Sequence, residues 1–254
     1  MKLSIIIPVF NEEKTILEVL DRVNSVEIHG VKKEIIAVDD ASTDATASVI
    51  SNFPLGFARG EQFPPRLRSG RAISNYKIFR HKKNLGKGAA VRTGIKHATG
   101  DYIIIQDADL EYNPKDIVRL LEPIKSNNAV VVYGTRLKRL PNFSRDERTP
   151  RFVLHYIGNR FLSFLTSILY GQWLTDMETC YKIFPSKIAK NLNIHAKGFD
   201  FEPEITAKLL KKGIKIVEVP IVTNPRGYKE GKKLRTLRDG SVAFWTLLKY
   251  RFVD

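Results

Sequence analysis

The sequence predicts an α/β protein with a doubly wound, mostly parallel β-sheet flanked by helices. Apolar, β-branched runs of strand length alternate with segments whose apolar residues recur at helical spacing. The chain has 254 residues, 43% of them hydrophobic, which is enough to bury a sizeable core, so we expect a single domain spanning residues 1–254. The predicted strands are residues 3–9, 34–38, 76–80, 103–109, 129–133 and 215–219.

The helices are predicted from spacing and from helix-start residues. Apolar residues recur with helical period over 16–23 and 45–50, and Pro114 is followed by a further helix. Between 52 and 75, prolines and glycines stand among arginines, which indicates a long basic loop that is either functional or mobile. Further helices are expected from Gly86, over 152–174, from Phe199 and over 244–252.

The helix expected at 152–174 is strongly apolar and aromatic. Its uninterrupted apolar part, residues 161–174, is too short to span a bilayer. Two readings stay open: a helix buried in the core, which base rates favour, and a helix that lies in the membrane interface.

Charge and cysteine content narrow the class of protein. The net charge of +15 favours anionic partners, namely nucleic acid, an anionic membrane surface or phosphate-bearing substrates. No nucleic-acid-binding motif is present, so we expect no nucleic-acid partner. Cys180 is the single cysteine, and the apolar run at the start is too short for a secretory signal. We therefore expect a cytoplasmic protein that can lie peripherally on the cytoplasmic face of a membrane.

Acidic residues mark the end of the central predicted strand. Asp107 and Asp109 are two residues apart, so on a strand both side chains would point to one side. Two carboxylates held that close repel each other, and Mg²⁺ or Mn²⁺ is a natural partner for their oxygens. The alternative is a polar loop with two solvated aspartates.

Polar groups also follow two other predicted strands. Asp39 and Asp40 follow residues 34–38, and Arg136 follows residues 129–133. These strand ends fall on one rim of a parallel sheet, where α/β proteins bind ligands. One of the two aspartates could accept hydrogen bonds from a base or ribose, or could serve only in a capping turn. Lys87 lies in a glycine-rich helix start that suits a phosphate, although a plain turn explains it as well.

Taken together in their order, these motifs resemble glycosyltransferase family 2, with the GT-A fold, and more closely the polyprenyl-phosphate (dolichol-phosphate) mannose and glucose synthases. Each piece is weak alone, but the ordered set covers nearly the whole chain. The matching pieces are Pro8-Val9-Phe10-Asn11-Glu12-Glu13, Val38-Asp39-Asp40-Ala41-Ser42, Asn84-Leu85-Gly86-Lys87-Gly88, Asp107-Ala108-Asp109-Leu110, Gly134-Thr135-Arg136, Asp176-Met177-Glu178-Thr179-Cys180-Tyr181-Lys182 and Glu230-Gly231-Lys232-Lys233.

The resemblance implies a role for each matched position. Residues 1–136 would bind a nucleotide-sugar donor, and residues 137–254 would form the acceptor side. Asp107 and Asp109 would carry the metal, Glu111 could add a ligand, and Asp176 would face the transferred sugar. The donor would be held by Pro8, Phe10, Glu12, Asp39, Asp40 and Lys87, and the donor and acceptor phosphates by Arg136, Arg151, His155, Arg226 and Lys232. The chain departs from the mannose synthases at His155, where those enzymes have a serine.

The implied reaction is an inverting transfer of a hexose from GDP-mannose or UDP-glucose to a polyprenyl phosphate. A lipid phosphate is already an anion at neutral pH, so it needs cations rather than a general base. A family member that acts on a glycan or another hydroxyl is the alternative, and it would need a base such as Asp176 or Glu178.

Overall fold

The structure is a computed structural model that describes residues 1–56, 76–136, 150–224 and 236–253, without the side chains of 54–56, 150–152 and 236–237. Seven strands form one sheet in the order β3-β2-β1-β4-β6-β5-β7. All neighbouring strands pair in parallel except β6, which is antiparallel to both β4 and β5. The strands are β1 (Lys2–Val9), β2 (Lys32–Asp39), β3 (Tyr76–Arg80), β4 (Tyr102–Ile105), β5 (Val131–Thr135), β6 (Lys182–Pro185) and β7 (Ile216–Pro220).

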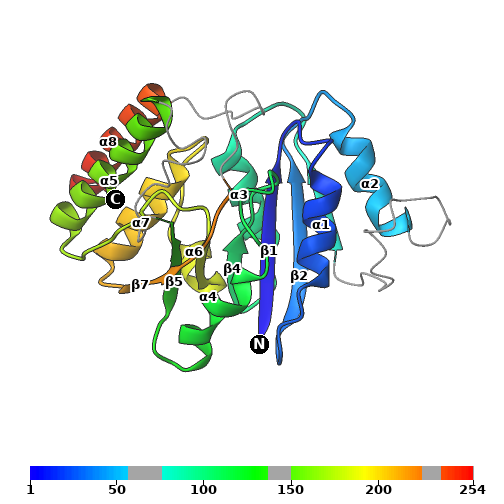
Figure 1. Ribbon diagram of the computed structural model, residues 1–254, viewed down its shortest axis with the longest axis horizontal. Helices are drawn as coiled ribbons and strands as arrows, with labels where there is room; N and C mark the ends of the chain where they lie inside the picture. The colour runs from blue at the N-terminus through cyan, green and yellow to red at the C-terminus, as the bar shows by residue number, and fades with distance from the viewer. Residues whose placement is uncertain (57–75, 137–149, 225–235, 254) are drawn as a thin grey trace.

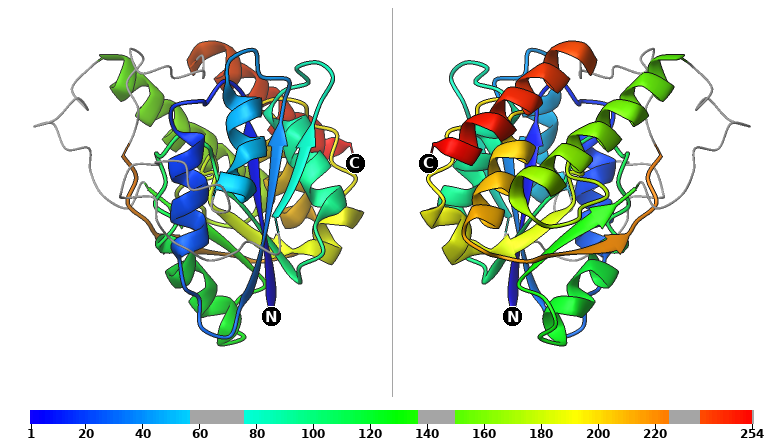
Figure 2. Two further views of the ribbon diagram at one scale, coloured as in Figure 1. Left: turned by 90° about the vertical axis from the view of Figure 1, so that its right-hand side faces the viewer. Right: turned by 90° about the vertical axis from the view of Figure 1, so that its left-hand side faces the viewer.

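The predicted α/β class and the mostly parallel sheet are confirmed. Figure 2 shows α1 and α3 on opposite faces of the sheet, as a doubly wound fold requires. β6 was not predicted, because four residues that include a lysine carry too little periodic signal. The helices are α1 (Ile16–Ser25), α2 (Thr46–Gly56), α3 (Lys87–His97), α4 (Asp116–Lys125), α5 (Pro150–Tyr170), α6 (Ser186–Asn191), α7 (Phe201–Lys211) and α8 (Thr236–Phe252).

The core is centred on β1, β2 and β4. Ile103, Ile104 and Ile105 of β4 are at most 1% exposed, because the strand lies inside the sheet with helices over both faces. β4 ends at Ile105, so Asp107 and Asp109 lie in the turn beyond the strand and not on it. The prediction assumed that both carboxylates lie on a strand and therefore point to one side, and that assumption was wrong.

The helix pair α5 and α8 closes the end of the sheet beyond β5 and β7. The two helices run side by side in the same direction (Figures 1 and 2). Leu162, Ala243 and Leu247 pack between them, and Tyr170 donates a hydrogen bond of 2.7 Å to the carbonyl oxygen of Leu247. The opposite side of α5 is exposed, so the reading of this segment as a buried core helix holds for one side of the helix only. Among the described residues, no helix is long and apolar enough to span a bilayer.

Candidate active site

A pocket of about 350 Å³ opens where β1, β2 and β4 reach their carboxyl ends. This is the rim that the sequence indicated, and residues from both halves of the chain line it. Ten of the predicted site residues lie in its wall, namely Pro8, Phe10, Glu12, Asp40, Lys87, Asp107, Asp109, Glu111, Arg136 and His155. Arg226 and Lys232 lie outside the described residues, and so does the side chain of Arg151.

Lys87 is a cation in the pocket wall that lies between two carboxylates. Its ammonium lies 2.9 Å from Asp107 Oδ1 and 2.9 Å from Glu202 Oε1, so it joins the turn after β4 to the start of α7. Burial alone would lower the pKa of Lys87, but the two carboxylates raise it well above its usual value. Burial alone would raise the pKa of Asp107, and the Lys87 ammonium instead holds that pKa below its usual value. Both groups are therefore charged at neutral pH.

The glycine-rich start of α3 is shaped by packing as well as by its lysine. Gly86 has φ of +95°, and a Cβ there would collide with the carbonyl oxygen of Lys197. A Cβ on Gly88 would meet the backbone of Ala196 at 2.9 Å. Only glycine permits so close an approach, which seats the start of α3 against residues 196–198.

Asp40 holds this glycine-rich loop in place. Its Oδ1 accepts the backbone N–H of Leu85 at 2.9 Å, and its Oδ2 accepts that of Gly86 at 2.7 Å. His81 Nδ1 lies 2.6 Å from the same Oδ1. Asp40 thus lines the pocket while organising the chain that presents Lys87.

Asp39, the other aspartate predicted here, lies outside the pocket wall. It is 1% exposed; its Oδ1 accepts the N–H of Ser42 at 2.9 Å, and its Oδ2 lies 3.0 Å from Arg80 Nε. The sequence could not show which of Asp39 and Asp40 lines the pocket, because both stand at the end of the same strand. For Asp39, the structure agrees with the alternative given above, in which the aspartate serves in a turn.

Arg136 is held by a fork of hydrogen bonds to Asp176. Its Nε donates to Asp176 Oδ2 and its Nη2 to Oδ1, both at 2.8 Å, and its backbone N–H donates to Oδ2 at 2.9 Å. The guanidinium carbon lies 6.0 Å from the centre of the Tyr112 ring. Burial alone would raise the pKa of Asp176, but Arg136 holds it below its usual value.

Asp176 is fully buried and is absent from the described lining of the pocket. The expectation that it faces the transferred sugar stays a prediction, and in the structure its carboxylate is bound to Arg136. Both carboxylate oxygens already accept hydrogen bonds from Arg136, so Asp176 is a positioning residue for that arginine.

Two other acids stand in the wall where Asp176 was expected. Glu178 and Glu202 both line the pocket, beside Cys180 and Phe199. Burial, and then the charge of Glu202, raise the pKa of Glu178 to about 8. Glu202 was not predicted as a site residue, because it stands in the first turn of an apolar helix, where an acid is ordinary.

The pocket offers oxygen donors of the kind that Mg²⁺ and Mn²⁺ prefer. Asp107, Asp109 and Glu111 all line it, and the cation now paired with Asp107 is the Lys87 ammonium. Within the described ranges, no three His, Cys, Asp or Glu side chains are already grouped as a metal cage. Such a donor set fits Mg²⁺, which is commonly bound by one or two carboxylates together with substrate phosphates.

Comparison with known proteins identifies the family. The model described as Glycosyl transferase family 2 matches residues 4–192. A UDP-N-acetylglucosamine–dolichyl-phosphate N-acetylglucosaminyltransferase of Methanococcus voltae is 31% identical over 86% of this chain and 84% of its own length. A dolichyl-phosphate β-glucosyltransferase of Trichomonas vaginalis is 28% identical over 88% of this chain and 64% of its own length.

Solved structures support the fold. Glucosyl-3-phosphoglycerate synthase from Mycobacterium tuberculosis, crystallised with Mn²⁺, UDP and glucosyl-3-phosphoglycerate, superposes with a TM-score of 0.66 at 17% identity. The match covers 100% of this chain and 81% of that one, and it confirms the GT-A fold. The matched family model, the sheet topology and the pocket at the strand ends agree, and the protein belongs to glycosyltransferase family 2.

Proposed function

We propose that this glycosyltransferase moves a hexose from a nucleotide sugar to a polyprenyl phosphate, with inversion at the anomeric carbon and with the help of Mg²⁺ or Mn²⁺. The names of the Methanococcus voltae and Trichomonas vaginalis relatives support a dolichyl-phosphate acceptor. Of the two donors expected from the sequence, UDP-glucose and GDP-mannose, the first is favoured because one of these names specifies a UDP-linked sugar.

The observation that carries the proposal is the pairing of acids and cations in one pocket. Asp107 and Asp109 stand there with Lys87 and Arg136, on the rim where the nucleotide is expected. A departing nucleoside diphosphate gathers negative charge, and positioned cations stabilise that charge in the transition state. Lys87 and Arg136 are anchored by buried carboxylates, so they need little rearrangement to do this.

Asp107, Asp109 and Glu111 are the residues that would hold the divalent metal. When bound, the metal would supply Lewis-acid stabilisation to the leaving diphosphate. With or without the metal, Lys87 and Arg136 would orient the diphosphate and bring a second anion close to it. A phosphate acceptor enters as an anion, so it requires this cationic surround and no general base.

The face of α5 next to the pocket supports a lipid-borne acceptor. Leu154, Ile157, Phe161, Phe164 and Ile168 follow one another at spacings of three and four residues, which places them on one side of the helix. Each is between 48% and 63% exposed, whereas a globular protein ordinarily buries such a stripe. His155, on the same first turns of α5, lines the pocket, so the stripe begins at the pocket rim.

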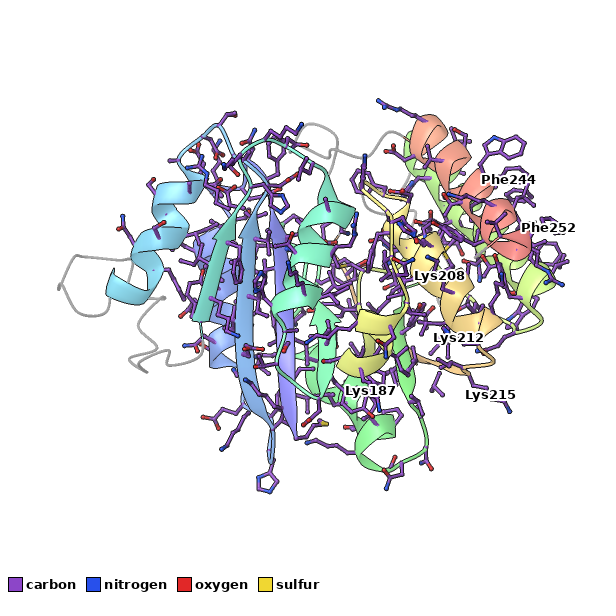
Figure 3. The ribbon with its side chains drawn as sticks, turned by 180° about the vertical axis from the view of Figure 1, so that it is seen from behind. Lys187, Lys208, Lys212, Lys215, Phe244 and Phe252 are labelled. Carbon is purple, nitrogen blue, oxygen red and sulfur yellow. The ribbon has the colours of Figure 1, made fainter. Side chains whose placement is uncertain are left out.

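α8 continues this apolar face. Trp245 is 66% exposed and Phe252 is 82% exposed; the Phe244 ring stacks on that of Phe161 with centroids 6.5 Å apart. Figure 3 shows Phe244 and Phe252 on α8, with Lys212 and Lys215 at the same end of the molecule. Lys212, Lys215 and Lys249 are exposed. An apolar, aromatic face with cations at its edge fits an anionic bilayer surface, from which the acceptor phosphate would reach the pocket.

A transfer assay tests the proposal. The protein would be incubated with UDP-glucose or GDP-mannose, Mg²⁺ or Mn²⁺, and a short polyprenyl phosphate, and mass spectrometry would identify the nucleotide and the lipid-linked product. We expect a nucleoside diphosphate and a hexosyl-phosphate lipid in equal amounts. Asp109→Ala should lower turnover by about 10²-fold or more, because the metal loses a ligand. Glu18→Ala, which removes an exposed acid on α1, should leave turnover unchanged.

A hydroxyl acceptor remains the second candidate, because Glu178 has a pKa of about 8 and lines the pocket, as a general base would. Water-soluble sugars offered in place of the lipid would decide between the two. Transfer to them at rates equal to or above those for the lipid phosphate would refute the proposed acceptor.

A further inference from the structure

Glu202 has a carboxylate oxygen that the fold leaves without a partner. The residue is 3% exposed, and its Oε1 lies 2.9 Å from Lys87 Nζ. Its Oε2 is buried and accepts no hydrogen bond from the residues that the structure describes. An ionised carboxylate can only accept hydrogen bonds, and a buried acceptor without a donor loses its hydration with nothing to replace it. Such an atom in a pocket wall indicates a ligand that brings the donor.

Glu178 presents the same feature on the neighbouring segment. Its Oε1 is buried and also lacks a hydrogen-bond partner within the described part of the chain, and the side chain lines the same pocket. Two acids from different segments, each with a buried oxygen that lacks a donor, therefore line one cavity. Phe199 adds an apolar surface beside them, with its ring centre 6.0 Å from Lys87 Nζ.

The position of these acids relative to the diphosphate site follows from Lys87. Its ammonium lies 2.9 Å from Asp107 on one side and 2.9 Å from Glu202 on the other. Asp107 belongs to the group that would hold the metal and the donor diphosphate under the proposed function. Glu202 therefore lies across the Lys87 ammonium from the acid that would hold the metal and the diphosphate, which is where the group carried by that diphosphate could reach it.

We propose that Glu202, with Glu178, forms the subsite for the transferred sugar, accepts hydrogen bonds from its hydroxyl groups, and selects neutral hexoses against hexuronic acids. This inference rests on the proposed function, because it takes the donor to be a nucleotide sugar. A neutral hexose supplies hydroxyl donors that satisfy the two oxygens. A hexuronate places its carboxylate against the Glu202 carboxylate in a buried wall, where like charges repel strongly.

Binding measurements separate this role from a general one in phosphate binding. Isothermal titration with Mg²⁺ would compare UDP with UDP-glucose, and GDP with GDP-mannose, on the wild type and on Glu202→Gln. We expect Glu202→Gln to weaken the sugar nucleotide on the order of tenfold, the value of a charged hydrogen bond, while the bare nucleotide changes less than about threefold. UDP-glucuronate should bind the wild type more weakly than UDP-glucose does. In Glu202→Gln, the difference between these two affinities should be smaller.

Glu204→Gln is the matched control. Glu204 stands on the same helix and is 1% exposed, but it pairs with Lys208 at 2.7 Å and is absent from the pocket lining. It should leave the ratio of the two affinities unchanged. An equal loss for the nucleotide and the sugar nucleotide in Glu202→Gln would overturn the subsite, because Glu202 would then act through Lys87. The subsite would also be overturned if Glu178→Gln and Glu202→Gln both kept the full wild-type preference for UDP-glucose over UDP-glucuronate.

Failure of the proposed function would look different. A wild type that binds UDP-glucose more tightly than UDP, loses that difference in Glu202→Gln, yet transfers no sugar to lipid phosphate would keep the subsite and refute the acceptor. A wild type that binds neither nucleotide nor sugar nucleotide would overturn both.

Discussion

Replacing Asp176 by asparagine tests whether this acid serves the reaction only through Arg136. Asparagine keeps the volume and one hydrogen-bond acceptor but removes the charge that the guanidinium faces. Three hydrogen bonds between 2.8 and 2.9 Å are affected, and Asp176 is fully buried. Breaking a buried ion pair by removing one partner costs about 3–5 kcal/mol, so we expect the free energy of unfolding to fall by that amount.

Turnover should fall as well, because the Arg136 guanidinium would no longer be fixed toward the leaving diphosphate. The loss of one positioned group of this kind costs about 10²–10³ in turnover. Urea denaturation followed by circular dichroism measures the first effect, and the rate of nucleotide release measures the second. Arg136→Gln and the double variant complete a cycle.

If Asp176 acts through Arg136, the double variant should be no slower than Arg136→Gln alone, and its stability should be closer to wild type than the sum of the two losses predicts. Asp176→Asn with wild-type stability, and losses in turnover that multiply in the double variant, would refute this reasoning. That result would restore the role expected from the sequence, in which Asp176 faces the sugar.

Two further predictions concern surfaces away from the pocket. The double variant Phe161→Asp/Trp245→Asp should reduce co-sedimentation with vesicles of anionic phospholipid at least fivefold, while transfer to a detergent-solubilised acceptor should be unchanged. The control Val130→Asp, at another exposed apolar side chain, should change neither co-sedimentation nor transfer. Unaltered co-sedimentation of the double variant would refute the proposed contact with a lipid surface. Glu34 is buried, and although burial alone would raise its pKa, hydrogen bonds from Lys77, Ser4 and Thr99 lower it from 4.5 to about 2. The unfolded chain therefore binds this proton first, so the contribution of up to about 3 kcal/mol is complete above pH 4.5 and is lost as the pH falls toward 2. Glu34→Gln should flatten the acid limb of a stability-against-pH profile, and a limb as steep as in the wild type would contradict the assignment.

The sequence by itself determined the class of the fold and the rim that holds the site. Continuous apolar runs can be buried on both faces only inside a sheet covered by helices, so the parallel core followed from local pattern. Because parallel strands end on one side, Asp40, Asp107 and Arg136 were placed together without any knowledge of the packing. The strand that was missed, β6, is short and has the weakest pattern.

Only the tertiary structure decided which acids face the cavity. Asp39 and Asp40, and likewise Asp176 and Glu178, are neighbours whose local sequence gives each the same claim on the site. The choice depends on which side chain meets a cation from a distant segment, as Asp176 meets Arg136. Glu202 reaches the site because the first turn of α7 meets Lys87 at the start of α3, a contact that no period along the chain encodes. The apolar stripe on α5 is a similar case, since helical spacing shows that one face is apolar, but only packing shows whether another element covers it.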